Sequence, residues 1–325
     1  MIKNNKLLFI DGVTRSGKSS ICQTIVALTN IEHVDLNYDF EYFFAGLVNK
    51  KINLSFAKKF LDSSFSRYTY DRILGRNLNL RKSDFTSIYN YYNPKIYLDR
   101  INLKNKFRRY HYKKTTFQKN TSNDNALNFL KSNFIYFPIQ SHYLLEHYNS
   151  LKKLKLNHKL LRLNRHPVDI IFSYYKRGWG KISKINTNHS YKYASYSVEK
   201  DKILIPWFLK ITKKKYLSFN EIERCIFSIV SNLKKIKKKY NSNIHFINFD
   251  SLCLNPNEEF DKICKFLRVK KQKKLRLFLA RANLPRKIDK IQREKKYRFL
   301  INSTKNKRLI SVLNQQIKLF EKSKT

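Results

Sequence analysis

Glycine and proline are scarce in this chain: each occurs six times among 325 residues, and methionine occurs once. We find no internal repeat and no linker rich in glycine and serine, so the sequence favours one large domain with a sizeable core. Long apolar runs are also missing, since none reaches the ~18 residues of a membrane-spanning helix. The first residues lead straight into a short apolar stretch, without the apolar core of a secretion signal. We therefore expect a soluble, cytoplasmic protein.

Cysteine is rare as well, and its four positions form no paired motif. Cys22, Cys225, Cys253 and Cys264 each lie in an apolar stretch, and no two are spaced as C-x-x-C. Such cysteines are typical of small buried hydrophobic side chains. We expect no disulfide framework in so large a chain, which indicates a reducing compartment.

Acidic residues are few, and the charge is strongly one-sided. The chain has 68 Lys and Arg against 23 Asp and Glu, a formal net charge of +45. Such a field attracts nucleotides, polyanionic glycans, nucleic acid or anionic membranes. Lysine, asparagine, isoleucine, phenylalanine and tyrosine are abundant together, however, which is typical of a genome rich in A and T codons. A non-enzymatic polyanion-binding protein is therefore an alternative hypothesis, but the charge by itself needs no functional explanation.

Short apolar strands alternate with helical patterns along the chain. The predicted strands are Leu7–Asp11, Val34–Phe40, Asn133–Ile139, Leu160–Leu163 and Ile244–Phe249. The predicted helices are Ser19–Thr29, Pro167–Lys176, Ile222–Lys239 and Glu258–Leu267. This alternation predicts an α/β fold, a three-layer sandwich around a central parallel sheet.

We expect a single domain over residues 1–325, with two regions of unusual composition. Residues 43–130 are helical, aromatic and basic in pattern, and 105–125 within them read as a polar, basic loop. Residues 270–325 are helical and very basic, apart from a break at Leu284 and Pro285.

The strongest motif follows the first predicted strand. Residues Gly12 to Ser19 read GVTRSGKS and match G-x-x-x-x-G-K-[ST] in full, between a strand and a helix. In such a loop backbone N–H groups cradle phosphate oxygens, the helix N-terminus adds positive potential, and basic and hydroxyl side chains donate hydrogen bonds. The expected nucleotide-binding residues of this loop are Gly12, Thr14, Arg15, Ser16, Gly17, Lys18, Ser19 and Ser20.

A second anion site is predicted further along the chain. Arg165 lies at the tip of a predicted strand, and Ser173 lies about two turns into the following helix. A guanidinium and a hydroxyl at this spacing can converge on one phosphate. The segment closely resembles the 3′-phosphate-binding segment of sulfotransferases that use 3′-phosphoadenosine 5′-phosphosulfate (PAPS), with Pro167 and Asp169 at the family's proline and aspartate. The resemblance implies that Arg165 and Ser173 bind the 3′-phosphate.

Two other segments carry the same resemblance, in the order that the family has. Arg15, Ser16, Gly17 and Ser19 match the family loop that grips the 5′-phosphosulfate, whereas Lys18 replaces a hydroxyl residue and gives the loop a nucleotide-kinase form. Ile244–Val269 resembles the family's late strand, loop and helix. The resemblance spans roughly residues 7–270 but not 43–128, and it implies a P-loop fold similar to that of nucleoside triphosphate hydrolases.

Sulfuryl transfer to a hydroxyl needs a base that takes its proton and cations that stabilise the leaving phosphate. His142 follows a predicted strand, at about the distance before Arg165 where many sulfotransferases place a catalytic histidine, although Gln140 replaces the family's lysine. Glu41 and Glu146 are the competing candidates, with Glu41 ranked second. Arg15 and Lys18 are the expected charge-stabilising residues.

We therefore predict an enzyme that uses PAPS, releases 3′-phosphoadenosine 5′-phosphate (PAP), and requires no metal. Its second substrate is an acceptor hydroxyl, for which a sugar hydroxyl is preferred, and residues 43–130 are the expected acceptor wall. Trp179, Trp207, Arg286 and Lys287 are further residues that can contact nucleotide or sugar. The alternative enzyme is a small-molecule kinase using ATP and magnesium, in which Asp250 at a strand end would hold the metal.

Overall fold

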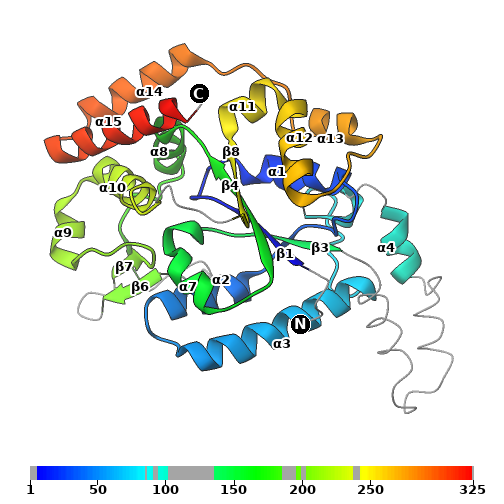
Figure 1. The fold of residues 1–325 in the computed structure, drawn as a ribbon. Helices are drawn as coiled ribbons and strands as arrows, with labels where there is room; N and C mark the ends of the chain where they lie inside the picture. The colour runs from blue at the N-terminus through cyan, green and yellow to red at the C-terminus, as the bar shows by residue number, and fades with distance from the viewer. Residues whose placement is uncertain are drawn as a thin grey trace.

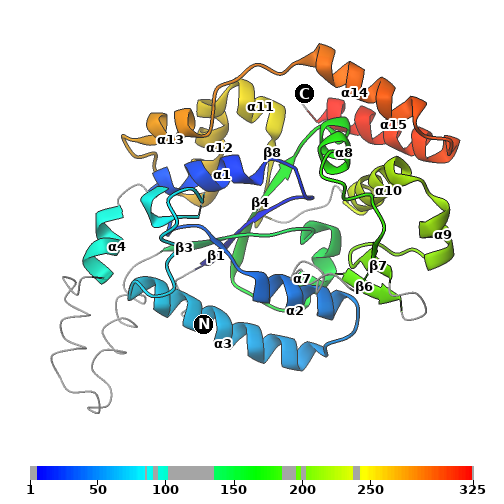
Figure 2. The ribbon, with the colours of Figure 1, turned by 180° about the vertical axis from the view of Figure 1, so that it is seen from behind.

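The computed structural model describes residues 6–84, 86–90, 94–101, 135–184, 195–198, 203–236 and 242–323. Within those residues it has the predicted α/β architecture, a central parallel sheet between two layers of helices (Figures 1 and 2). The predicted loop at 105–125 lies outside the described residues, and so does the end of the predicted helix Ile222–Lys239.

The central sheet has five strands among the described residues, in the order β2-β3-β1-β4-β8, and every pairing is parallel. They are β1 (Lys6–Asp11), β2 (Asp35–Leu36), β3 (Tyr136–Gln140), β4 (His158–Asn164) and β8 (Ile244–Asn248). The middle strand, β1, is buried on both faces, as its continuous apolar run predicts. Because its pairings are parallel, the carboxyl end of β1 lies at the same edge of the sheet as the carboxyl ends of its neighbours. Ligand-binding loops are found at this edge in parallel sheets.

Alternate residues of β1 point into two different helix layers. Leu8 and Ile10 belong to a core that they share with α1 (Lys18–Thr24), the 3-10 turn η1 (Ile25–Ala27), α11 (Phe249–Leu254), α12 (Pro256–Leu267) and α13 (Leu275–Arg281). Leu7 and Phe9 belong to a larger core on the other face. Figure 1 shows α2 and α3 below the sheet and α11, α12 and α13 above it.

The helices of the larger core come from distant parts of the chain. They are α2 (Tyr38–Val48), α3 (Leu54–Ile73), η3 (Leu145–His147), α7 (Tyr148–Lys153), α8 (Pro167–Tyr175), α9 (Lys213–Ser218), α10 (Glu221–Leu233), α14 (Lys290–Asn302) and α15 (Lys307–Lys322). The remaining described helical elements are η2 (Ile88–Asn90) and α4 (Pro94–Ile101). The basic C-terminal region is thus part of the folded core, through Leu300 and Leu313.

Two predicted strands end earlier than their apolar patterns suggest. β2 covers only two residues of Val34–Phe40, because the Asn37 side chain accepts a hydrogen bond from the Phe40 N–H and starts α2. β8 ends before Phe249, because the Asn248 side-chain oxygen Oδ1 accepts hydrogen bonds from the N–H groups of Asp250 and Ser251 and starts α11. In both places a local capping bond outweighs strand propensity.

A small antiparallel sheet was not predicted. It consists of β5 (Ser183–Lys184), β7 (Ile203–Pro206) and β6 (Ser195–Val198), with β7 in the middle. Its strands are two to four residues long, which is too short for a periodic pattern to be recognised in the sequence.

Candidate active site

The loop Gly12–Ser19 joins β1 to α1, and its two glycines are required by close contacts. A Cβ on Gly12 would collide with the Ser16 side chain, and Gly17 has a φ of 96° with the Phe249 ring directly against it. The left-handed backbone at Gly17 suits glycine and leads into the first turn of α1. The loop therefore has the glycine-dependent turn that the motif predicts.

Lys18 lies beneath this loop. Its Nζ donates to the carbonyl oxygens of Gly12 and Val13, each at 3.0 Å, and the side chain is buried. Burial lowers the pKa of Lys18 to about 8, although the negative charge of Asp11 favours the protonated form. In this structure the Lys18 ammonium group therefore stabilises the backbone of the loop and does not project outward from it.

The second predicted anion site meets the first one. Arg15 Nε donates to Ser173 Oγ at 2.8 Å, and Arg165 Nη1 donates to the Arg15 carbonyl oxygen at 3.0 Å. Ser173 is on α8 and Arg165 directly follows β4, so residues about 150 apart in the sequence share one site. The pKa of Arg15 is lowered by burial and by the positive charges of Arg177 and Arg165. This concentration of positive charge favours an anion at the site.

Phe249 completes the site, and the sequence analysis did not single it out. Its ring packs against Gly17, with the guanidinium carbons of Arg165 and Arg286 lying 4.9 and 5.3 Å from its centroid. An aromatic side chain directly after the late strand, two residues before Ser251, was the signal available in the sequence. Arg286 thereby joins the cationic cluster, whereas the neighbouring Lys287 is exposed.

His142 and Glu41, the two leading candidates for the base, contact each other. His142 follows β3, Glu41 lies in the first turn of α2, and Nδ1 of the histidine is 2.5 Å from Oε1 of the glutamate. Their side chains are 25% and 21% exposed, so an acceptor can reach them. The carboxylate fixes the orientation of the ring and leaves Nε2 available.

Comparison with known proteins identifies the family. The model of the family described as "Sulfotransferase domain" matches residues 8–286. The chain belongs to the sulfotransferase family. No curated protein matches it.

Three solved structures are similar to this sulfotransferase. The sulfotransferase domain from the curacin biosynthetic pathway is 12% identical, with 83% of this chain and 76% of that chain covered and a TM-score of 0.40. The sulfotransferase domain from the Synechococcus PCC 7002 olefin synthase is 11% identical, with 96% and 94% covered and a TM-score of 0.42. Sulfotransferase STF9 from Mycobacterium avium is 8% identical, with 94% and 78% covered and a TM-score of 0.39.

The third candidate base, Glu146, belongs to a buried ionic cluster beneath the site. Arg162 on β4 is fully buried, donates to Asp11 at the end of β1 at 2.7 Å, and also contacts Glu146. Burial raises the pKa of Glu146 and Arg162 opposes that shift, whereas the nearby Arg162 charge and the Leu144 N–H hold the pKa of Asp11 below its usual value despite burial. A glutamate held in this way links the turn η3 to β4 and does not face an acceptor.

Asp169 and Asp250 are held by the C-terminal helix α14. Arg293 donates to Asp250 through both terminal nitrogens, at 2.9 and 3.0 Å, and to Asp169 through Nε at 2.9 Å. Lys296 also donates to Asp169, at 2.9 Å. Asp250, the residue that the kinase hypothesis assigns to magnesium, therefore has both carboxylate oxygens engaged by an arginine.

The remaining predicted contacts are divided between surface and interior. In the loop, Ser19 is exposed and Ser20 is half-buried. Trp179 is 39% exposed beside Tyr174, whereas Trp207 is buried among aromatic rings. Burial was predicted for all four cysteines: Cys22, Cys225 and Cys253 are buried, whereas Cys264 is half-buried, and all four are free thiols.

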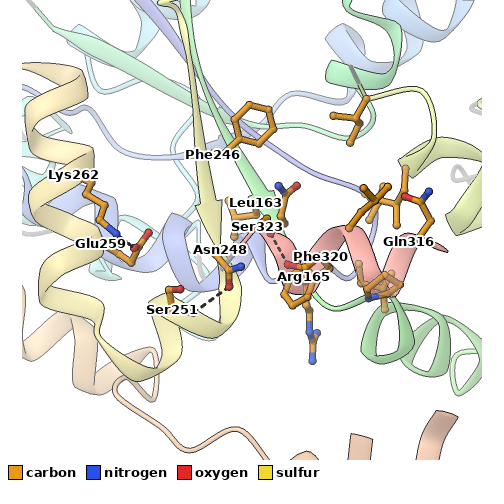
Figure 3. A pocket seen from close by; sticks show the side chains of 17 residues that line it. Leu163, Arg165, Phe246, Asn248, Ser251, Glu259, Lys262, Gln316, Phe320 and Ser323 are labelled. Carbon is orange, nitrogen blue, oxygen red and sulfur yellow. Dashed lines mark hydrogen bonds and ion pairs between the residues drawn. The ribbon is translucent and has the colours of Figure 1, made fainter. Parts of the chain in front are cut away.

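A cavity of about 550 Å³ lies on the other side of Arg165, between β8 and α15 (Figure 3). Asn248 lines it from the end of β8, Ser251 from α11, and Gln316 and Phe320 from α15. In the close-up, the Arg165 guanidinium and the Phe246 ring lie at opposite sides of the cavity, and the guanidinium points away from the ring. The cavity shares Arg165 and Val13 with the site described above, whereas His142 and Ser173 do not line it.

No helix in the part of the chain that the structure describes is both long enough and apolar enough to cross a membrane.

Proposed function

We propose that this sulfotransferase uses PAPS as its sulfuryl donor and a hydroxyl group as its acceptor. The observation that carries the proposal is the meeting of Arg15, Arg165 and Ser173 beside the phosphate loop. A nucleotide with phosphates at both its 5′ and 3′ ends needs two anion sites, and a loop with a neighbouring arginine–serine pair supplies two. The partial burial of these cations strengthens their interaction with an anion.

Polar groups that lack partners support the fit of such a nucleotide. Ser16 Oγ and Arg165 Nε are buried and have no hydrogen-bond partner among the described residues. Buried polar atoms of this kind normally have a partner, so a ligand that accepts hydrogen bonds would satisfy them. We assign the 5′-phosphosulfate to the loop Gly12–Ser20, the 3′-phosphate to Arg165 and Ser173, and the adenine to the Phe249 face.

PAPS supplies a sulfuryl group on a phosphate leaving group. In the transfer, the acceptor oxygen forms a bond to sulfur while the bond between sulfur and the phosphate oxygen breaks, leaving its electron pair on PAP. We assign His142 Nε2 as the base that takes the acceptor proton, and Glu41 as the carboxylate that orients the ring and stabilises its protonated form. Arg15 and Lys18 offset the negative charge that develops on the leaving phosphate.

The acceptor approaches from the side of α2 and the turn after β3, where His142 and Glu41 are partly exposed. We propose a sugar hydroxyl as the acceptor class and the described part of residues 43–130 as one wall. Tyr97 is fully buried, so this aromatic residue packs in the interior and is not available for stacking on a sugar.

The proposal is tested by calorimetric titration of PAP, adenosine 5′-monophosphate and magnesium-ATP. We expect PAP to bind without magnesium and more tightly than adenosine 5′-monophosphate, which lacks the 3′-phosphate. Ser173→Ala should weaken PAP binding by about tenfold and leave binding of adenosine 5′-monophosphate unchanged, because a hydrogen bond to a charged group contributes about 1.5–3 kcal/mol.

A matched control is Ser231→Ala on α10, which removes a buried hydroxyl that has no hydrogen-bond partner in the described structure. This variant should bind PAP like the wild type. Tight binding of magnesium-ATP together with no binding of PAP would overturn the assignment and support a kinase.

A further inference from the structure

Tyr143 directly follows the proposed base and has an unusual backbone conformation. Its φ of 60° lies in the left-handed region, which is costly for a bulky side chain. Such a conformation persists only where surrounding contacts hold it. The contacts at Tyr143 hold its hydroxyl, its ring and the backbone that follows it.

The hydroxyl contacts the phosphate loop. Tyr143 is buried, and its OH donates to Thr14 Oγ1 at 3.0 Å. Because the Thr14 oxygen accepts this bond, the threonine proton is left to donate to another acceptor. Thr14 is half-buried beside Arg15, where the 5′ end of the proposed nucleotide would lie.

The ring is held from the opposite side by the turn that follows β7. It stacks on Phe208 with a centroid separation of 3.9 Å and meets Trp207 edge-on at 6.1 Å. Trp207 is in turn tied to the end of α2 by Asn49, whose side chain donates to the Trp207 carbonyl oxygen at 3.4 Å. Stacked and edge-on rings of this kind restrict the position of the phenol group.

The backbone after Tyr143 is anchored to the strand that leads into the phosphate loop. The N–H groups of Leu144 and Leu145 donate to the Asp11 carboxylate at 3.1 and 3.2 Å. Asp11 is the residue before Gly12, and Arg162 holds it from below. The turn that bears His142 is therefore held at two points, by Asp11 at the end of β1 and by Thr14 in the loop.

From this geometry we propose that Tyr143 is a positioning residue for sulfuryl transfer. It acts through Thr14: it orients the threonine hydroxyl as a donor to the 5′ end of the nucleotide and sets the distance between that end and His142. The inference rests on the proposed use of PAPS, and it adds a residue that neither anion motif contains.

The test compares two tyrosines of the same burial, one at the start of β3 and one just beyond its end. Tyr143→Phe removes the bond to Thr14, whereas Tyr136→Phe removes a bond of 3.2 Å from a buried hydroxyl to the Leu267 carbonyl oxygen, at the far end of the strand. Both variants should lower the melting temperature. Only Tyr143→Phe should weaken PAP binding measured by calorimetry, by about threefold to tenfold, as expected for one neutral hydrogen bond.

Variants at Thr14 separate positioning from a general loss of structure. In Thr14→Ser, which keeps the hydroxyl, Tyr143→Phe should still weaken PAP binding, whereas in Thr14→Val it should have little further effect. Equal PAP affinities of Tyr143→Phe and Tyr136→Phe, or an undiminished effect in Thr14→Val, would overturn the role of Tyr143 while leaving the proposed function intact. Failure of the wild type to bind PAP would overturn both.

Discussion

At the scale of single residues, His142 and Glu41 were competing candidates in the sequence and are partners in the structure. A histidine whose Nδ1 contacts a carboxylate has one tautomer favoured, with Nε2 available to accept a proton. The carboxylate then stabilises the imidazolium that forms when the acceptor loses its proton. The two residues therefore have different roles, with Glu41 acting through His142.

Substitution of each member of this pair has a different expected effect. His142→Ala should lower the rate of PAP release from PAPS by about 10²–10⁴-fold, because it removes the base. Glu41→Gln should lower it less, because the amide still orients the ring but does not stabilise its positive charge. Product analysis by chromatography measures both rates, and calorimetry should show unchanged PAP binding. A larger loss in Glu41→Gln than in His142→Ala would reverse the assignment.

The lowered pKa of Lys18 predicts that nucleotide binding depends on pH. Its pKa in the protein without nucleotide is about 8, lowered from 10.5 mainly by burial. Protonated Lys18 attracts the nucleotide, and above about pH 8 a growing fraction of the protein must take up a proton in order to bind. The dissociation constant of PAP should therefore be flat below about pH 8 and rise by up to about tenfold per pH unit above it. Titrations between about pH 7 and 9.5 measure this slope.

Lys18→Met is the control for this slope. The variant should bind PAP more weakly and show a flat profile over the same range. A flat profile in the wild type would mean that Lys18 stays on the carbonyls of Gly12 and Val13 and contributes no charge to binding.

At the scale of secondary-structure elements, the family resemblance and the apolar patterns predicted the strands, helices and loop that carry the site. They did not predict the side-chain contacts that hold these elements together. The loop at Gly12 could be predicted because it needs glycine at two positions, and α8 because Pro167 suits a first helical turn. The pairing of Arg162 with Asp11 and Glu146 could not be predicted, because β4, the end of β1 and the turn η3 come together only in the folded protein. A sequence read alone shows such residues only as isolated charges.

The C-terminal helices illustrate the same limit. Residues beyond 270 were predicted as a very basic helical region, and most of that charge is exposed. Arg293 is different, since it joins Asp169 on α8 to Asp250 on α11 and so fixes the helix that carries Ser173. Nothing in the sequence distinguishes Arg293 from the lysines around it, because its partners lie more than 40 residues away along the chain.

At the scale of the whole molecule, the net charge of +45 predicts a second kind of binding that differs from nucleotide recognition. When a protein binds a polyanion through exposed lysines, counterions are released, so the affinity falls steeply with salt, by about 10³–10⁵-fold between about 50 and 200 mM for six to ten phosphate contacts.

Duplex DNA should therefore bind at low salt and be released at about 200 mM sodium chloride. It should bind the Arg165→Ala and Lys18→Ala variants as it binds the wild type. PAP makes few charge contacts and should remain bound at the higher salt, with Arg165→Ala weakening it. Fluorescence anisotropy with labelled DNA and calorimetry with PAP measure the two. DNA binding that persists at high salt in a chain that does not bind PAP would identify polyanion binding, not sulfuryl transfer, as the role of this charge.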